Sequence, residues 1–513
     1  MTRNVPRLAA LAAIFLLVVA RTASAQDITL TSRDGTVVLH GTLIQYDGEF
    51  YRIGTEYGPM TVDGEAVRCS GPGCPVPGEH VARIAMSGAR SIATGLIPPL
   101  IEGYARQRGL HATRVIHDDS RFTYRLAAPD GPVLAEIAVQ AGSTAEGFAD
   151  LLAGEADIAL ASRPPNAADR EAGPVATGRA QVLGLDAVVA VVAPGNPVTA
   201  LRLDDLKGIF TGRIANWREL GGPDVAITAY ARPDGTASAA LLRARITEGP
   251  IGAGVKRLPG DKAIADAVAA DPFAIGLTGY AHRGTARALG LTGDCGYPVW
   301  PTDAALKAGD YPLTVRLLAY RPARRLPRLA RSLLDYLGSE AAQALLPRAG
   351  FVGQDIVTLP FAAEGPRLAH AIASAGRDVG LAELQRMVAE LDGARRLSAG
   401  FRFDGGASGL DAGSRVNVDL LARRIAAGGF DGQELIFAGF SDAEGPAALN
   451  RRLSLERAEA VRRALAAALD GTAAERLAMR SVGFGELSPL ACDDTPWGRR
   501  VNRRVEIWVR PQR

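Results

Sequence analysis

The sequence predicts a multidomain protein with a small N-terminal all-β module, a two-lobed α/β region and a C-terminal α/β domain. Its 513 residues exceed what one compact core holds, because domains typically contain about 100–150 residues. Hydrophobic residues make up 47% of the chain and charged residues 22%, which is enough to bury cores and excludes wholesale disorder. The pattern also changes along the chain, from short β-rich runs to strands followed by helices, and this change marks the domain boundaries.

Residues 1–25 are typical of an export signal. Arg3 and Arg7 precede an apolar run over residues 8–20, and small residues then supply a cleavage site. The run is shorter than the ~20 residues of a membrane helix, so we expect a cleaved signal peptide and a periplasmic location. An uncleaved N-terminal anchor is the alternative.

The charge of the chain is nearly balanced. Its net charge of +3 comes from 58 Lys and Arg against 55 Asp and Glu, and three of the positive charges are Arg3, Arg7 and Arg21. The mature chain is therefore neutral and has no global field that attracts nucleic acid. We expect no nucleic-acid partner, and any anion must be recognised at a local site.

Residues 26–79 alternate short β-rich runs with Asp-Gly turns, which predicts a small antiparallel sheet or barrel. Cys69 and Cys74 flank a turn of Ser, Gly and Pro, and an oxidising compartment favours a disulfide between them. Zinc is the weaker alternative, because the histidines form no ligand-spaced pair, and we predict no metal and no cofactor. Cys295 and Cys492 lie in different segments, and their pairing stays open.

Residues 80–352 alternate strands and helices over a length that favours two lobes around a cleft. Ligands of such sheets bind outside the carboxyl ends of the strands, where loops lead into helix N-termini. Residues 353–397 are expected to form a linker with a helix over 381–391. As a pure coil this linker would reach roughly 35–40 Å.

Residues 398–513 are expected to form a compact α/β domain. Its motifs are Gly439-Phe-Ser-Asp442, Asn450 to Arg457 with Ser454 between them, and Asn502-Arg503-Arg504. They resemble the OmpA C-terminal-like, peptidoglycan-binding domain. The resemblance implies that Asp442 and Arg457 clasp the diaminopimelate of the stem peptide, with Asn450 and Arg503 beside them.

The chemistry of this pair suits a zwitterion. A carboxylate pairs with the ammonium group of an amino-acid end, and a guanidinium fork pairs with its carboxylate. The structural alternatives are a helix cap for Asp442, a solvated helix residue for Arg457, and strand or helix ends held by Asn450 and Arg503.

The central region carries four short motifs at the starts of predicted helices or loops: Ser87-Gly-Ala-Arg90-Ser91, Ala141-Gly-Ser143-Thr144, Ala161-Ser162-Arg163 and Arg232-Pro-Asp-Gly-Thr236-Ala-Ser238. In this order they resemble the periplasmic phosphate-binding proteins of Pst-type ABC transporters, over roughly residues 81–350. The resemblance implies an anion site without a metal, built from hydroxyls, backbone N–H groups and arginine. Its expected residues are Ser87, Ser91, Ser143, Ser162, Arg163, Arg232, Thr236 and Ser238.

Arg163 departs from the pattern of that family, which places an acceptor Asp at this position. An acceptor carboxylate rewards a protonated oxyanion and repels a fully ionised one, so the change widens the expected ligand from phosphate to similar oxyanions. The structural alternatives are helix caps for the serines and Thr236, and salt bridges for Arg163 and Arg232.

These observations favour a non-enzymatic binding protein, exported and held on peptidoglycan, that captures phosphate or a similar oxyanion. An ABC permease is a candidate partner. The alternative is a structural cell-wall or outer-membrane-associated protein with a degenerate cleft. No GxSxG elbow, metal cluster or Ser/His pairing is visible, so we expect no catalytic residues.

Overall fold

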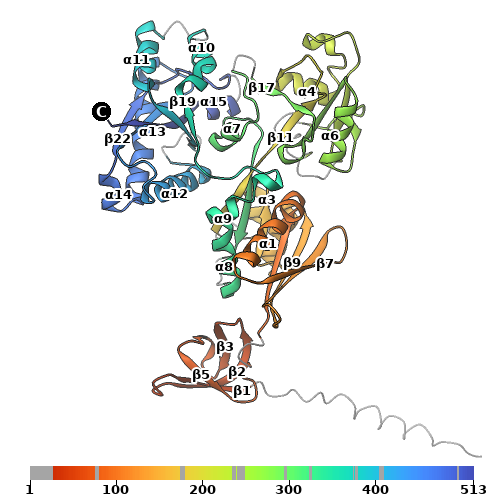
Figure 1. The fold of residues 1–513 in the computed structure, drawn as a ribbon, viewed down its shortest axis with the longest axis vertical. Helices are drawn as coiled ribbons and strands as arrows, with labels where there is room; N and C mark the ends of the chain where they lie inside the picture. The colour runs from red at the N-terminus through yellow and green to blue at the C-terminus, as the bar shows by residue number, and fades with distance from the viewer. Residues whose placement is uncertain are drawn as a thin grey trace, which may run out of the picture.

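The computed structural model describes residues 27–75, 80–173, 179–233, 239, 249–293, 297–322, 326–373, 375, 379–403, 409–493 and 496–512. Figure 1 shows an N-terminal β module, two α/β lobes and a C-terminal α/β domain. The expected signal peptide over 1–25 lies outside the described residues. Within the described part, no helix is both long and apolar enough to cross a bilayer.

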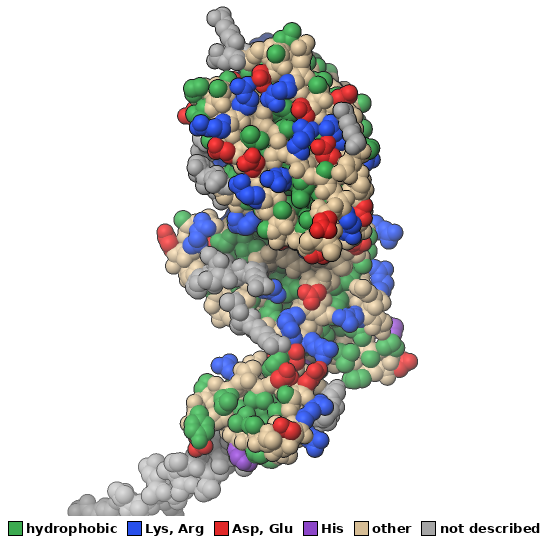
Figure 2. All heavy atoms as spheres, turned by 90° about the vertical axis from the view of Figure 1, so that its left-hand side faces the viewer, with side chains coloured by type: hydrophobic (Ala, Val, Ile, Leu, Met, Phe, Trp, Pro, Cys, Tyr) green, Lys and Arg blue, Asp and Glu red, His purple; other side chains and the backbone are tan. Residues whose placement is uncertain are grey.

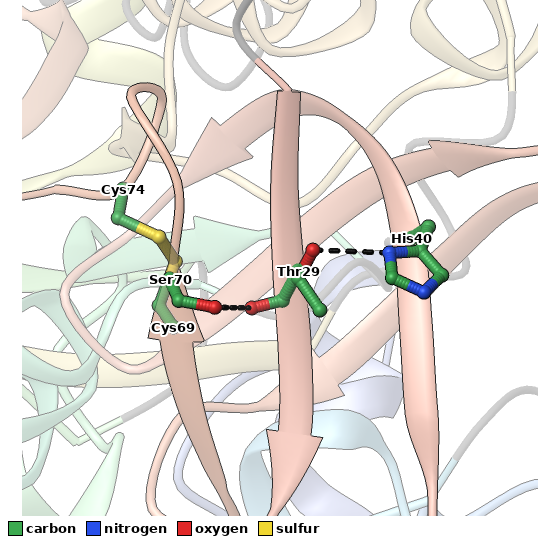
Figure 3. The surroundings of a disulfide bond; sticks show 5 residues. All are labelled: Thr29, His40, Cys69, Ser70 and Cys74. Atoms are coloured by element: carbon green, nitrogen blue, oxygen red, sulfur yellow. Dashed lines mark hydrogen bonds between the residues drawn. A yellow bond between two sulfur atoms is a disulfide. The ribbon is translucent and has the colours of Figure 1, made fainter.

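The N-terminal module is an antiparallel sheet, as predicted, with strand order β4-β3-β2-β1-β5. Its small core centres on Ile28, Leu30 and Ile53. Cys69 of β5 and Cys74 form the expected disulfide beside β1 (Figure 3). The strands are β1 (Asp27–Ser32), β2 (Val38–Tyr46), β3 (Phe50–Thr55), β4 (Gly58–Asp63) and β5 (Val67–Ser70).

The central region has two cores joined by two long strands, which confirms the two-lobed prediction. β11 (Arg179–Val192) and β18 (Thr314–Arg321) pair with each other and run from one lobe into the other. In the first lobe the central strands β6 and β10 are almost wholly buried, as expected for parallel strands covered on both faces.

The first lobe has strand order β10-β6-β9-β8-β7. It contains β6 (Ala82–Ala89), α1 (Ile97–Gln107), β7 (His111–Ile116), β8 (Arg121–Ala127), β9 (Val133–Gly142), α2 (Thr144–Ala153), β10 (Ile158–Ala161), α3 (Ala167–Glu171), α8 (Arg328–Leu337) and α9 (Glu340–Gln343).

The second lobe is built on β14-β13-β15-β11. It contains β12 (Ala200–Arg202), α4 (Leu203–Thr211), β13 (Thr228–Ala231), β14 (Lys256–Arg257), α6 (Asp261–Ala270), β15 (Ala274–Gly279), β16 (Arg287–Ala288), β17 (Gly290–Thr292) and α7 (Asp303–Ala308).

Helix α8 of the first lobe faces the N-terminal module. Arg331 pairs with Glu49, and Arg328 lies 3.6 Å from Glu65. Both glutamates belong to the N-terminal module. These arginines therefore make contacts with the N-terminal module.

The C-terminal domain is a sheet of order β19-β20-β23-β21-β22 with helices on both faces. Leu435 and Phe437 of β21 pack toward α12 and α13, whereas Ile436 and Phe440 pack toward α10 and α11. Its elements are β19 (Thr358–Pro360), α10 (Gly365–Ala373), α11 (Leu381–Leu391), β20 (Arg395–Arg402), α12 (Ala412–Ala426), β21 (Gln433–Phe440), α13 (Ala447–Ala468), α14 (Gly471–Glu475), β22 (Ala478–Gly483), α15 (Pro496–Asn502) and β23 (Arg504–Pro511).

The described part of the segment 353–397 contains the expected helix over 381–391, and its remaining described residues are not a pure coil. β19 pairs with β20, and α11 buries Leu384, Met387 and Leu391 against the C-terminal sheet. The apolar face of α11 is covered because it supplies one half of that sheet's packing. The described part of this segment is therefore packed on the C-terminal sheet and is not a loose tether.

The surface of the C-terminal domain carries basic and acidic side chains in an interspersed pattern. Figure 2 shows this mixture on the face that it presents, without a large area of one sign. Such a surface creates no strong local field. Recognition on this face would therefore depend on individual placed charges.

Candidate functional site

The predicted serines of the first lobe lie at one edge of its sheet. β6 runs parallel to both β9 and β10, so the carboxyl ends of the three strands meet there. Ser87 lies near the end of β6, Ser143 follows β9 and Ser162 follows β10. Ser91 begins the short helical turn Ser91–Leu96 after β6. This edge is where parallel sheets bind ligands.

The hydroxyls of Ser87, Ser143 and Ser162 already have protein partners. Ser87 donates to Asp150, and Ser143 caps α2 by accepting from the N–H of Glu146 at 3.2 Å. The hydroxyl of Ser162 lies 3.1 Å from that of Thr144. The capping interpretation therefore describes Ser143, and a ligand at this edge would meet mainly backbone N–H groups and shared hydroxyls.

Arg163 is paired within its own lobe. Its guanidinium contacts both carboxylate oxygens of Asp169, with Nη2 to Oδ1 at 3.3 Å. Asp169 also closes a capping box with Asn166 at the start of α3. Burial opposes ionisation of Asp169, but these hydrogen bonds and the charge of Arg163 leave the pKa of Asp169 below its ordinary value. Arg163 thus brings no uncompensated positive charge.

Arg232 lies at the carboxyl end of β13 in the second lobe. Its Nη1 is 3.8 Å from Oδ1 of Asp261, the first residue of α6. Nε of Arg232 is buried and makes no hydrogen bond, and neither does that Asp261 oxygen. Arg232 is therefore the cation of the predicted anion site that keeps hydrogen-bonding capacity. The predicted residues Thr236 and Ser238 lie outside the described residues.

Asp186, which the sequence analysis missed, lies beneath this part of the second lobe. It is 8% exposed, and a Cβ placed on Gly279 would lie 3.3 Å from Oδ2 of both Asp186 and Asp261. Burial raises the pKa of Asp186 to about 6, although the N–H groups of Ala187 and Ala281 and the nearby His282 act in the opposite direction. Its position within a strand gave no motif that could have identified it.

We expect Asp186→Asn to remove a pH dependence of stability between about pH 4 and pH 6. In this window the folded chain holds a proton on Asp186 that the unfolded chain has lost, so rising pH lowers the stability of the wild type. A shift from 3.8 to about 6 corresponds to about 3 kcal/mol at most. Urea unfolding of both proteins at pH 4 and pH 7 measures it. A stability difference that is the same at both pH values would contradict the assignment.

The predicted residues of the C-terminal domain gather at the carboxyl end of β21. Asp442 follows β21, is 8% exposed and pairs with Arg503. Arg457 of α13 lies over the ring of Phe403 at 5.7 Å, and its buried Nη1 makes no hydrogen bond. Burial lowers the pKa of Arg457, and the neighbouring charge of Asp442 partly restores it. A carboxylate and an incompletely bonded guanidinium thus share one site.

The other predicted residues of this site, Asn450 and Arg503, contact acidic side chains next to it. Asn450 donates to Glu486 at 2.8 Å, and Arg503 neutralises Asp442. The sequence analysis missed Asp493, whose carboxylate accepts from the N–H of Ala443 at 2.7 Å and from Asn502 at 2.9 Å. Asp493 therefore fixes the loop that begins at Asp442.

Within the described ranges, no group of three His, Cys, Asp or Glu side chains is placed to hold a metal ion. Cys492 is disulfide-bonded, and Cys295 lies outside the described residues.

Comparisons with known proteins match the central region and the C-terminal domain to two separate families. Residues 77–341 match the family described as "PBP superfamily domain", and residues 402–503 match "OmpA family". The phosphate-binding protein PstS of Bacillus subtilis is 30% identical over 212 residues, which are 41% of this chain and 68% of that protein. The peptidoglycan-binding protein ArfA of Mycobacterium tuberculosis is 42% identical over 71 residues, 14% of this chain and 21% of that protein.

A solved structure of an ABC-type phosphate transport receptor from Vibrio cholerae also resembles this chain. It has 22% sequence identity, covers 52% of this chain and 99% of the receptor, and has a TM-score of 0.42.

Proposed function

Because this chain belongs to the PBP superfamily and carries a C-terminal OmpA-family domain, we propose that it is a non-enzymatic periplasmic binding protein anchored to peptidoglycan. Its two lobes capture phosphate or a similar oxyanion, and its C-terminal domain binds the diaminopimelate of the stem peptide. The likeness to PstS supports the first part, and the likeness to a peptidoglycan-binding protein supports the second.

The observation that carries the anion proposal is the state of Arg232. Its buried Nε has no hydrogen-bond partner at the carboxyl end of a strand, where loops and helix starts also offer N–H groups. A guanidinium with free donors favours a small oxyanion with several acceptor oxygens. Arg163 is paired with Asp169 through hydrogen bonds, whereas Arg232 lies 3.8 Å from Asp261 and keeps its Nε unbonded, so Arg232 is the cation on which the proposal depends. An ABC permease that takes the anion from the cleft is the finer part of the proposal, supported by the PstS likeness.

The bound hydroxyls favour a second candidate, a structural wall protein with a degenerate cleft. The hydroxyl of Ser87 donates to Asp150, and the hydroxyl of Ser143 caps the start of α2, as they would in a fold that has no ligand. In this candidate function the C-terminal domain still binds peptidoglycan, but the two lobes do not capture an anion.

Calorimetric titration of the mature chain with phosphate separates the two candidates. We expect heat of binding in the wild type and a loss of affinity of about 10- to 100-fold in Arg232→Ala, because a hydrogen bond to a charged group contributes about 1.5–3 kcal/mol. Arg218→Ala is the matched control, since Arg218 lies in the same lobe, is 66% exposed and pairs with Asp224. No heat at millimolar phosphate from a folded chain would support the structural candidate.

A further inference from the structure

The C-terminal domain contacts the second lobe through buried ion pairs. Asp310, which follows α7, accepts from Nη2 of Arg396 at 2.6 Å and from Nη2 of Arg402 at 3.1 Å. Both arginines belong to β20, and all three side chains are nearly inaccessible. A Cβ placed on Gly400 would lie 2.1 Å from the carbonyl oxygen of Ala308, so strand and helix approach backbone to backbone. Figure 1 shows α7 between the C-terminal domain and the rest of the second lobe.

The same domain contacts the first lobe through α12. Val416 packs against the cluster that contains Phe148, Leu318 and Tyr320 of the first lobe. The guanidinium of Arg316, in β18, lies against the backbone of Gly413, where an added Cβ would be 2.2 Å from its Cζ. One rigid domain therefore contacts both lobes, on either side of the strands that connect them.

A short path links the second lobe to the stem-peptide site. A Cβ placed on Gly293 would lie 3.3 Å from both N and Sγ of Cys492. The next residue, Asp493, accepts from the N–H of Ala443, directly beside Asp442. Gly293 follows β17 of the second lobe. Movement of the second lobe would therefore displace the loop that carries Asp442, the carboxylate predicted to bind peptidoglycan.

We propose that the C-terminal domain braces the two lobes, so that the angle between them is coupled to the stem-peptide site at Asp442. Two-lobed proteins capture ligands by rotation of one lobe against the other. If one lobe rotates against the other, the C-terminal domain can move with only one of them. The rotation must therefore break either the Asp310 contacts with the second lobe or the Val416 contacts with the first lobe. The proposal that the C-terminal domain holds the two lobes together is inferred from the interface alone. Its effect on ligand affinity rests on the proposed function.

The brace is tested first without any ligand, by electron–electron resonance distances between spin labels on Glu155→Cys in the first lobe and Asp266→Cys in the second. Both positions are exposed. We expect a narrow distance distribution in the full mature chain. We expect Asp310→Asn and, separately, Val416→Ser to broaden it about twofold or more, because the first removes the charge that pairs with two arginines of β20 and the second removes the apolar contact to the first lobe. Asp224→Asn, which removes an exposed ion pair within the second lobe, is the control and leaves the distribution unchanged.

Val416→Ser keeps the measurement decisive if Asp310→Asn does not fold, because it leaves the buried charges in place. Distributions of the folded variants that superimpose on that of the wild type would overturn the brace. This result does not depend on whether the chain binds phosphate.

The coupling is tested by titrating phosphate with and without a soluble stem tripeptide that contains diaminopimelate. We expect the tripeptide to change the dissociation constant of phosphate about fivefold or more, and phosphate to change that of the tripeptide by the same factor, as linkage requires. In Val416→Ser the factor falls toward one. A wild-type factor of one with both ligands bound would overturn the coupling, whereas absence of binding by either ligand would overturn the proposed function.

Discussion

The double variant Asp442→Ala, Arg457→Ala is expected to lose retention on purified peptidoglycan sacculi by at least about 30-fold relative to the wild type. Removing a buried, hydrogen-bonded charge from an interface costs about 2 kcal/mol or more, which corresponds to this factor. The site places the Asp442 carboxylate, which is shared with Arg503, beside the incompletely bonded guanidinium of Arg457, and a zwitterionic amino-acid end has groups that can pair with both. Co-sedimentation of the mature chain with sacculi over a range of protein concentrations measures the effect.

A matched pair on the same helix provides the control. Arg452 and Glu456 are 70% and 58% exposed and lie 3.6 Å apart, so Arg452→Ala, Glu456→Ala removes one positive and one negative charge outside the site. This variant should be retained like the wild type. Equal retention of the Asp442, Arg457 variant would show that other residues attach the chain to the wall.

Glu506→Gln is expected to lower the free energy of unfolding of the C-terminal domain by about 3–5 kcal/mol, because it leaves buried guanidinium groups without their counter-charge. The two Nη atoms of Arg367 donate to Glu506 at 2.7 and 3.1 Å, and Nε of Arg504 donates at 2.7 Å. Burial alone would raise the pKa of Glu506, but Arg367, Arg396 and Arg504 outweigh it and hold the pKa well below its ordinary value. Glu506 is therefore charged in the folded chain at neutral pH.

Urea unfolding at neutral pH, followed by tryptophan fluorescence, to which the buried Trp508 contributes, and by circular dichroism, measures this loss. The stabilisation by Glu506 is present above the pKa of the unfolded chain and is lost as the pH falls toward the depressed folded value, so the difference between the two proteins shrinks in acid. Glu456→Gln removes an exposed carboxylate of the same domain and should change the stability by less than about 0.5 kcal/mol. A similarly small effect for Glu506→Gln would contradict the role assigned to the cluster.

The sequence predicted the C-terminal domain well because its strands and helices are long and its motifs are local. The helix expected over 381–391 is α11, and Asp442, Arg457 and Arg503 come together as the motifs implied. The hidden partner of Arg163 also had a local signal. Asn166 and Asp169 have the spacing of a capping box, which places Asp169 within reach of Arg163.

Other features depend on contacts between residues far apart in the sequence, and no local pattern marks them. β19 has 3 residues, too few for a periodic signal, and the apolar face of α11 does not reveal that the C-terminal sheet covers it. The pairing of Asp310 with Arg396 spans 86 positions. The bond from Asp493 to Ala443 likewise joins two loops that only the folded domain brings together.

The folded segment between the lobes and the C-terminal sheet has a consequence for transport. If the C-terminal domain holds the chain on peptidoglycan as proposed, the two lobes would stay close to the wall, since the segment before β20 is built from a paired strand and packed helices. Under that proposal the anion would have to reach the cleft by its own diffusion, because the protein that binds it would not move freely.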